Sequence, residues 1–332
     1  MNAKPPAENL VEPHEPHWVS RAAFPVLTGV FFITQAGLGV AVYHQIYWLA
    51  VPLVLALSHL MHGMLIGLHE ASHGLLRKTR FLNEFDGTII GAFGFMSFSL
   101  YRVVHQSHHA YLASERDEEL WPFVKPNVSR PARILAAILE LFAGLVYTPF
   151  LFIRAFLRTD SRIRKKDLRR RIWIEFSVSA LLWIVVFTAI AWWDVWKYFL
   201  WLYLAPAVLA ANMQSLRKYI EHVGLTGSTV NSSTRSIVAD NWLGRLVAFS
   251  LLHEPFHGIH HKHAGLPHAE LPQFVGELTP KIPEDRSPFL SYRHAFADLF
   301  KSLADPRVGA QWRAVQSPQE QEQVLSKAGQ AR

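Results

Sequence analysis

The chain of 332 residues is 50% apolar, only 18% charged and free of cysteine. This composition excludes an ordinary soluble domain, a disulfide framework and a thiolate metal site or nucleophile, and it favours residence in a membrane. The net charge of +7 does not indicate a nucleic-acid partner, because the basic residues lie beside apolar runs instead of forming a tract of their own.

The first 21 residues are polar and proline-rich and show no cleavable signal peptide, so residues 1–21 are expected to form an N-terminal segment outside the membrane. Four apolar runs that follow are each close to the roughly 20 residues that a bilayer requires. They are expected to span the membrane as two tight hairpins, Ala22–Tyr43 with Ile46–Leu68 and Ile172–Trp193 with Val195–Met213.

The basic residues predict the orientation of these spans. The two outer turns carry only Lys197, whereas the stretch between the hairpins carries "LLRKTR" (75–80) and "RTDSRIRKKDLRRR" (158–171). Short loops rich in lysine and arginine stay in the cytoplasm. We therefore expect the middle region and both termini to be cytoplasmic.

Two further apolar runs, about Thr88–Tyr101 and Ile134–Phe156, do not fit as single spans. A crossing by the second run would place 158–171 outside and separate the histidine-rich segments across the membrane. Each run is therefore expected to be an interfacial helix or a re-entrant hairpin, the second bent near Pro149. The predicted architecture is an all-α integral membrane protein with four transmembrane helices, interfacial helices and a cytoplasmic histidine-rich cap. Its membrane domain covers 22–305, and a polar, loosely ordered tail follows at 306–332.

Three histidine-rich motifs lie at the face that this topology makes cytoplasmic. In "HEASH" (69–73) the histidines stand at i and i+4, a spacing that places both on one face of a helix. "HQSHH" (105–109) and "HGIHH" (257–261) repeat an HxxHH core with the same outer spacing. Each motif can present two or three imidazoles to one point, and neutral imidazole binds Fe, Zn, Cu and Ni.

The number of histidines favours two metal ions. Packing eight imidazoles together without a cation would be opposed by mutual repulsion and by desolvation. The alternative, in which these eight are merely solvated or core residues, does not explain why the HxxHH core is repeated. Eight or more imidazoles fit two metals better than one.

The three motifs, in this order, resemble the histidine boxes of the membrane fatty acid desaturase superfamily. That superfamily also contains hydroxylases, carotenoid ketolases and fatty acid decarboxylases that form terminal alkenes. The resemblance covers about 25–275 and includes a Glu-His segment, "RKYIEHVG" (217–224), and a Thr-Arg segment, "NSSTRSI" (231–237). It implies a di-iron centre whose ligands are His69, His73, His105, His108, His109, His222, His257, His260 and His261.

Carboxylates beside such histidines are expected to orient them, because ligand imidazoles usually donate their second N–H to an acceptor. Glu70, Glu221 and Glu254 are the candidates for this role. His253 and His62 are further candidates for supporting groups around the ligands.

Other histidines and small residues have open interpretations. His263 and His268 follow the third motif and are expected to be supporting or solvated groups. His59 lies with His62 inside the second span, where an ionisable residue is a functional candidate and a hydrogen bond between helices is the alternative. Gly63 and Gly67 have the spacing of a helix-packing pair.

Four cations are candidates for contact with an anionic head group, although snorkelling or positive-inside placement explains each of them as well. They are Arg102, Arg217, Lys218 and Arg235.

Breaking an unactivated C–H bond needs a redox-active metal and dioxygen, which iron can use and zinc cannot. The resemblance implies that two iron ions, with O2 as co-substrate, act on a fatty acyl chain that enters from the bilayer. Desaturation is the leading prediction. Hydroxylation, ketolation and decarboxylation to a terminal alkene are the alternatives, because the outcome depends on substrate position to within about an ångström.

The chain has no flavin fingerprint, haem-attachment motif or CxxC pair, so electrons are expected from a separate ferredoxin, rubredoxin or cytochrome b5-type donor with its reductase. The basic segment 158–171 could dock an acidic donor, and positive-inside orientation explains it equally well. Two non-enzymatic alternatives are a bis-histidine haem protein and a metal transporter, both of which would place their ligands at bilayer depth.

Overall fold

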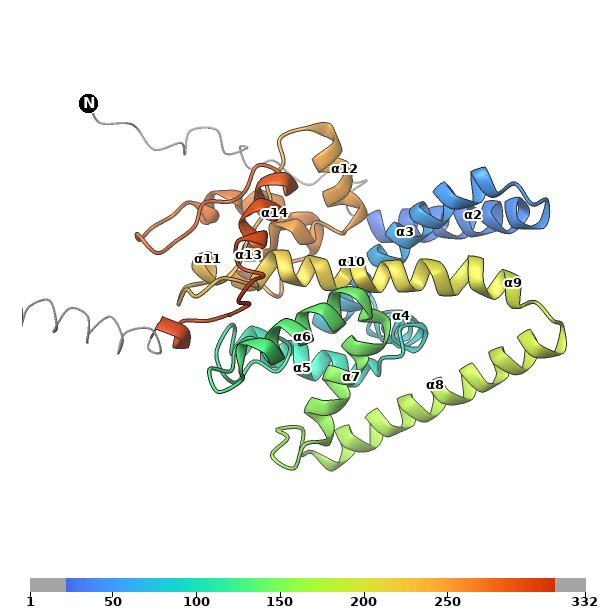
Figure 1. Cartoon of the computed structure of the whole chain (residues 1–332), viewed down its shortest axis with the longest axis horizontal. Helices are drawn as coiled ribbons and strands as arrows, with labels where there is room; N and C mark the ends of the chain where they lie inside the picture. The colour runs from blue at the N-terminus through green and yellow to red at the C-terminus, as the bar shows by residue number, and fades with distance from the viewer. Residues whose placement is uncertain (1–21, 314–332) are drawn as a thin grey trace, which may run out of the picture.

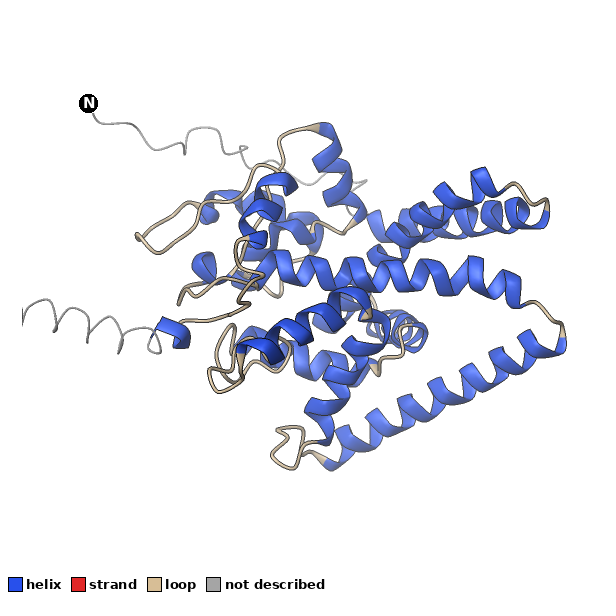
Figure 2. Ribbon diagram, viewed as in Figure 1, coloured by secondary structure: helices blue, strands red, loops and turns tan. Residues whose placement is uncertain are grey.

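The computed structural model describes residues 22–313, and this part of the chain is helical, without a named β-strand (Figure 2). Four helical segments are long and apolar enough to cross a membrane. They are α2 (Ala23–Tyr43), α3 (Tyr47–His73), α8 (Lys166–Trp192) and Trp196–His222, which joins α9 (Trp196–Phe199), the π-helical η2 (Leu200–Leu204) and α10 (Ala205–His222). The predicted all-helical fold with four long apolar helices is confirmed.

The first hairpin, α2 and α3, packs tightly through buried leucine, alanine and valine side chains such as Leu38 and Leu57. Helix α3 continues past the predicted end at Leu68 and stops only at Gly74, which adopts the left-handed conformation with φ of 81°. Both histidines of the first motif therefore lie in the last turns of α3.

The second hairpin is not tight, in contrast to the prediction. Helices α8 and α10 diverge from the turn around Asp194 (Figure 1). Helix α10 packs along α3 and α7 (Gly144–Leu157), whereas α8 packs against α4 (Arg80–Phe93) and α5 (Phe98–Ala110). The packing partners explain the divergence, because each helix buries its face against a different pair of neighbours.

Helices α4 and α5 occupy the first of the two extra apolar runs and meet at a bend of 100°. Helix α4 starts beside the end of α3, and α5 ends at the histidines that meet His73, so both ends of the pair lie on one side. This arrangement is that of a re-entrant hairpin or an interfacial pair, as the sequence predicts. At the start of α5, Ser97 and Ser99 donate hydrogen bonds to Glu175 of α8, which fixes the bend.

The second extra run is two helices, α6 (Arg130–Phe142) and α7, that meet at Ala143 and not near Pro149 as predicted. Pro149 lies inside α7. The reason for the break is close packing on α10: the Gly144 amide donates to Asn212 Oδ1 at 3.1 Å, and a Cβ on Gly144 would lie 2.8 Å from the Ala211 carbonyl oxygen.

The remaining helices form a cap around the ends of α3, α5 and α10 (Figure 1). Within the cap, α12 leaves Trp242, Leu243 and Leu246 exposed and ends at Ser250, whose hydroxyl lies 2.7 Å from His59 Nε2 of α3. The cap comprises α11 (Val230–Ser233), α12 (Trp242–Ser250), η3 (Glu254–Phe256), α13 (His257–Lys262), η4 (His268–Leu278) and α14 (Tyr292–Phe300).

The chain after Pro306 does not become a loose tail at once. The Val308 amide donates to the Phe123 carbonyl at 3.0 Å, and the indole of Trp312 donates to the same carbonyl at 2.8 Å. Both side chains are buried. Residues up to Arg313 thus pack on the body, because the polar segment contains these two apolar anchors. The rest of the predicted tail and the N-terminal segment 1–21 lie outside the described residues.

Candidate metal centre

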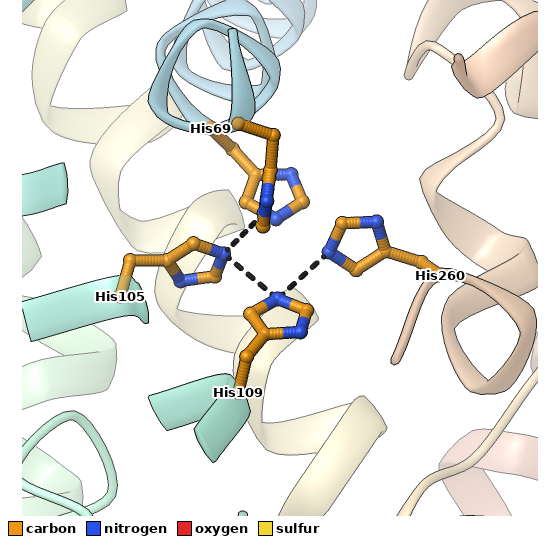
Figure 3. A group of neighbouring side chains, drawn as sticks. His69, His105, His109 and His260 are labelled. Carbon is orange, nitrogen blue, oxygen red and sulfur yellow. Dashed lines mark hydrogen bonds between the residues drawn. The ribbon is translucent and has the colours of Figure 1, made fainter. Parts of the chain in front are cut away.

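The three histidine motifs and the end of α10 converge at one place. Helix α3 brings His69 and His73, α5 brings the second motif, α10 ends at His222, and the short α13 carries the third motif. Figure 3 shows rings from α3, α5 and the cap pointing toward one another. Helical structure at each motif is what makes this possible, since the i and i+4 rings then share a face.

Five of these residues form what we call the five-histidine cluster, with one ring nitrogen of each within 4.8 Å of all the others. The Nε2 atom of His105 lies 3.0 Å from that of His73 and 3.2 Å from that of His109, which in turn lies 3.0 Å from that of His260. The members are His69, His73, His105, His109 and His260.

Four residues form the four-histidine cluster beside it. His257 Nε2 lies 2.8 Å from His222 Nε2 and 3.0 Å from His261 Nε2. The rings of His109 and His261 stack with centroids 4.3 Å apart and join the two clusters. The members are His108, His222, His257 and His261.

The two HxxHH motifs contribute to the clusters in a reciprocal way. Each gives its i and i+4 pair to one cluster and its i+3 residue to the other. Thus His105 and His109 meet His260, while His257 and His261 meet His108. Neighbouring helix residues such as His108 and His109 point in directions about 100° apart, which is why they serve different clusters.

Acidic side chains fix the second nitrogen of several rings. Glu254 contacts both clusters: Oε1 is hydrogen-bonded to His257 Nδ1 at 2.9 Å in the four-histidine cluster, and Oε2 lies 3.0 Å from His69 Nδ1 in the five-histidine cluster without hydrogen-bond geometry. Asp117 lies 2.8 Å from His108 Nδ1, and Glu119 lies 2.9 Å from His105 Nδ1. A Nδ1–H that donates to a carboxylate leaves Nε2 as a lone pair.

The donor set fits a metal ion. Neighbouring Nε2 atoms in the clusters are about 3 Å apart, the separation of two ligands that meet at right angles on bonds of about 2.1 Å. His69 Nε2 is buried and has no hydrogen-bond partner among the described residues. Converging lone pairs repel one another unless a cation lies between them. Both clusters therefore have the geometry of histidine metal sites.

The ionisation of the imidazoles agrees with this conclusion. Burial, followed by the proximity of neighbouring histidines, lowers the pKa of His105, His260 and His261 well below its usual range. Burial lowers the pKa of His257 to about 4 despite the opposing effect of Glu254. These rings are neutral near pH 7 and can act as ligands without first losing a proton.

The carboxylates proposed from the sequence have different surroundings. Glu254 touches both clusters, as described, and Glu221 lies 3.6 Å from His257 Nε2. Glu70 is buried within 4.8 Å of His69 and Glu254, and one of its oxygens has no partner among the described residues. Asp117 and Glu119 were not expected. The acidic stretch after the second motif, "ERDEEL", is the signal that could have indicated them.

The extra histidines do not join the clusters. His253 pairs with His268 through Nδ1 atoms 3.1 Å apart, and His263 bonds Glu277. His62 is buried in α3 with Nε2 unpartnered among the described residues. His59 forms a hydrogen bond with Ser250, and this contact explains the position of His59 without a role as a metal ligand.

The predicted glycine pair in α3 packs against neighbouring elements. A Cβ on Gly63 would lie 2.7 Å from the Ser250 carbonyl oxygen, and one on Gly67 would lie 2.6 Å from the Phe24 ring. Both positions therefore permit close helix packing.

The four cations considered for contact with a substrate head group all form ion pairs within the protein. Lys218 and Arg235 are buried, and Arg217 is nearly so. Arg235 also donates to the carbonyls of Ile220 and Val223. These contacts explain the cations without a substrate. The partners are Glu221 and Glu254 for Arg217, Glu140 for Lys218, Asp298 for Arg235 and Glu84 for Arg102.

A cavity of about 570 Å³ lies close to the clusters, although none of the clustered histidines is among its lining residues. Its wall is mostly apolar and comes from α2, α3, α4, α7 and α10, including Phe31, Met64 and Ala210. Its lining also includes Glu119, which bonds His105, and Arg217, which bonds Glu254. The volume lies in the range of small-ligand sites. Glu119, and Arg217 through Glu254, therefore link the lining of this mostly apolar cavity to the histidines.

Comparison with known proteins supports this geometry. A family model described as "Fatty acid desaturase" matches residues 46–293, a range that contains all three motifs and His222. Among curated proteins no match is found. The family is one of oxidoreductases that act on lipids, which excludes the haem-carrier and transporter alternatives as the primary assignment. The match extends over most of the chain, which belongs to the fatty acid desaturase family.

Proposed function

We propose that the protein is a membrane-bound, O2-dependent di-iron oxidase of fatty acyl chains and that its main reaction is desaturation. The observation that carries the proposal is the pair of adjoining histidine clusters, with a mostly apolar cavity nearby whose lining residues Glu119 and Arg217 contact the clusters or their supporting carboxylate. One iron ion would be held by the five-histidine cluster and one by the four-histidine cluster. When bound, such irons supply the redox chemistry with dioxygen that zinc lacks.

The residues of the chain then have distinct roles. The nine clustered histidines bind the ions, and Glu254, Asp117 and Glu119 orient His257, His108 and His105 by accepting from Nδ1. Glu70 and Glu221 lie beside this layer and support it. The cavity holds the acyl chain away from water and fixes which carbon lies nearest the clusters.

The ion pairs of Arg217 and Lys218 form the polar wall between chain and metals. Because the carboxylates already neutralise these cations, we propose that they shape this wall and that a head group binds elsewhere on the cap side. The histidine clusters, the cap and both termini are assigned to the cytoplasm from the basic segments at 75–80 and 158–171.

A product analysis tests the proposal. Purified protein is loaded anaerobically with Fe(II), then given oxygen, a reductase with an acidic ferredoxin, and fatty acids of graded length. Detection by gas chromatography of an olefinic acid with unchanged chain length would support desaturation. A hydroxy acid, or a 1-alkene one carbon shorter, would assign hydroxylation or decarboxylation instead. Absence of any oxygen-dependent product with two irons bound would refute the oxidase assignment.

A further inference from the structure

Two arginine side chains lie over one exposed aromatic ring next to the second histidine motif. Tyr111, directly after α5, is 37% exposed. The guanidinium carbon of Arg116 lies 5.4 Å from its ring centroid, and that of Arg162 lies 5.2 Å away. Arg116 belongs to the loop after α5 and Arg162 to the loop between α7 and α8, so two distant segments bring their charges to one ring. We call these three residues the arginine–tyrosine patch.

The patch carries a net positive charge. No carboxylate forms an ion pair with Arg116 or Arg162 among the described residues, whereas the nearby Arg154 and Arg158 both pair with Glu118. Arg164 and Lys165 are also exposed in the second loop, as is Lys166 at the start of α8, and the exposed acid of that loop, Asp160, pairs with Arg158. Glu115 is the exposed acid of the first loop. Two unneutralised guanidiniums held together on a surface attract an acidic partner and speed its approach.

The loop that carries the patch is bonded to the metal centre at both ends. The Tyr111 amide donates to the Ser107 and His108 carbonyls at 3.0 and 3.3 Å. Further along the same loop, Asp117 accepts a hydrogen bond from the Ala113 amide at 3.1 Å, and its carboxylate lies 2.8 Å from His108 Nδ1. Only a few bonds therefore separate the surface ring from a histidine of each cluster, His108 and His109.

We propose that the arginine–tyrosine patch is the docking surface for an acidic one-electron carrier protein of the ferredoxin class. This proposal rests on the proposed function and specifies its partner. In a desaturation, O2 accepts four electrons: two leave the substrate with two hydrogens as the C=C bond forms, and two come from two reduced carriers. Two protons from water complete the reduction, and two waters are released.

Carrier docking explains the patch better than lipid contact does. Anionic lipid would be satisfied by any basic residue at the surface of the membrane. The patch instead combines tyrosine with arginine, residues enriched at protein interfaces, on a loop tied to the metal-binding histidines. A carrier needs this short connection, and a lipid does not.

The test compares the charge-reversed double variant Arg116→Glu/Arg162→Glu with a matched control, Arg293→Glu/Lys301→Glu, which changes two exposed cations at α14 by the same charge. Full-length iron-loaded protein is reduced by a purified acidic ferredoxin in stopped flow and assayed in coupled turnover. We expect the KM for ferredoxin to rise at least tenfold in the first variant, with a weaker dependence on salt, and to stay within twofold in the control. Iron content and dithionite-driven turnover should match the parent protein in both.

An equal KM in the two double variants would overturn the docking proposal while leaving the oxidase assignment intact. An equal loss of dithionite-driven turnover would also overturn it, by showing that the arginines support the centre itself. Loss from the membrane fraction, or activity that depends on anionic lipid, would assign the patch to lipid. If the reversed variant does not fold, Arg116→Gln/Arg162→Gln should still raise the KM about threefold to fivefold, and an unchanged KM there would count against docking.

Discussion

The Nε2 atoms of His109 and His260 lie 3.0 Å apart although 151 residues separate them in the sequence. One ring comes from α5 and the other from the cap. Their contact shows that the cap folds onto the ends of the membrane helices and completes each cluster. Removing either part would leave both clusters short of ligands.

Substitution of one histidine from each cluster should abolish turnover without preventing membrane insertion. His108→Ala removes a ligand from the four-histidine cluster and His260→Ala one from the five-histidine cluster. We expect fewer than two irons per chain by metal analysis and loss of product by at least a hundredfold. The control is His294→Ala, because His294 is exposed and its ring is hydrogen-bonded to Ser291. This variant should retain both the iron content and the turnover of the parent protein. Full activity in either cluster variant would refute the ligand assignment.

Glu254→Gln should weaken both clusters at once, because this carboxylate contacts His69 and His257. Loss of a partner that orients ligand histidines typically costs 10–100-fold in metal affinity. Competition with a chelator measures that affinity. Glu270→Gln, a partly exposed acid of η4, is the matched control. Equal chelator sensitivity of the two variants would show that Glu254 does not orient the rings.

Filling the cavity should change the accepted chain length. Ala210 is 1% exposed and lines the cavity from α10, so Ala210→Phe places a ring in the space assigned to the acyl chain. We expect the ratio of activity on the longest to the shortest accepted fatty acid to fall at least tenfold. Overpacking costs about 1–3 kcal/mol, and thermal unfolding monitors this cost. The control variant Ala180→Phe, on the exposed face of α8, should leave this activity ratio unchanged. An unchanged ratio in Ala210→Phe would show that the acyl chain binds elsewhere.

The metal-free protein should lose stability on acidification below neutral pH. Burial lowers the pKa of His253 to about 4 and that of His268 to about 3, below the 6.5 of an exposed histidine. The unfolded chain therefore binds more protons between about pH 6.5 and 4, and the free energy of unfolding falls across this window. Thermal unfolding at several pH values measures the slope. The variant His253→Leu/His268→Leu should show a shallower slope, and an unchanged slope would exclude the pair as a cause.

The sequence predicts the parts of this molecule that depend on local pattern. The apolar runs predict both ends of α2, the start of α3 and the end of α8 to within one residue, and the spacing in each motif places its rings on helix faces. The polar ends were missed: α3 continues from Leu68 to His73, the fourth span from Met213 to His222, and α8 begins at Lys166 instead of Ile172. The break at Ala143 was missed because it results from the contact of Gly144 with α10, which is not visible in the sequence of α6 and α7. Proline was the stronger local signal, but Pro149 is accommodated inside a helix.

Long-range contacts account for the other differences. Helices α8 and α10 diverge because each packs against different neighbours. Val308 and Trp312 pack on the body because both donate hydrogen bonds to the carbonyl of Phe123, which is far away in the sequence. Asp117 and Glu119 could not be assigned to particular rings, because their loop folds back on α5 in a way that spacing alone does not indicate. The same holds for the partners of Arg217 and Lys218.

Glu254 contacts a histidine of each cluster, so the loading of the two sites would be interdependent. Binding at His257 would fix the position of Glu254, whose other oxygen lies 3.0 Å from His69 Nδ1. Uptake should accordingly be cooperative, with half-loaded molecules scarce at every iron concentration. Such coupling would guard against a lone iron reacting with oxygen before its neighbour arrives.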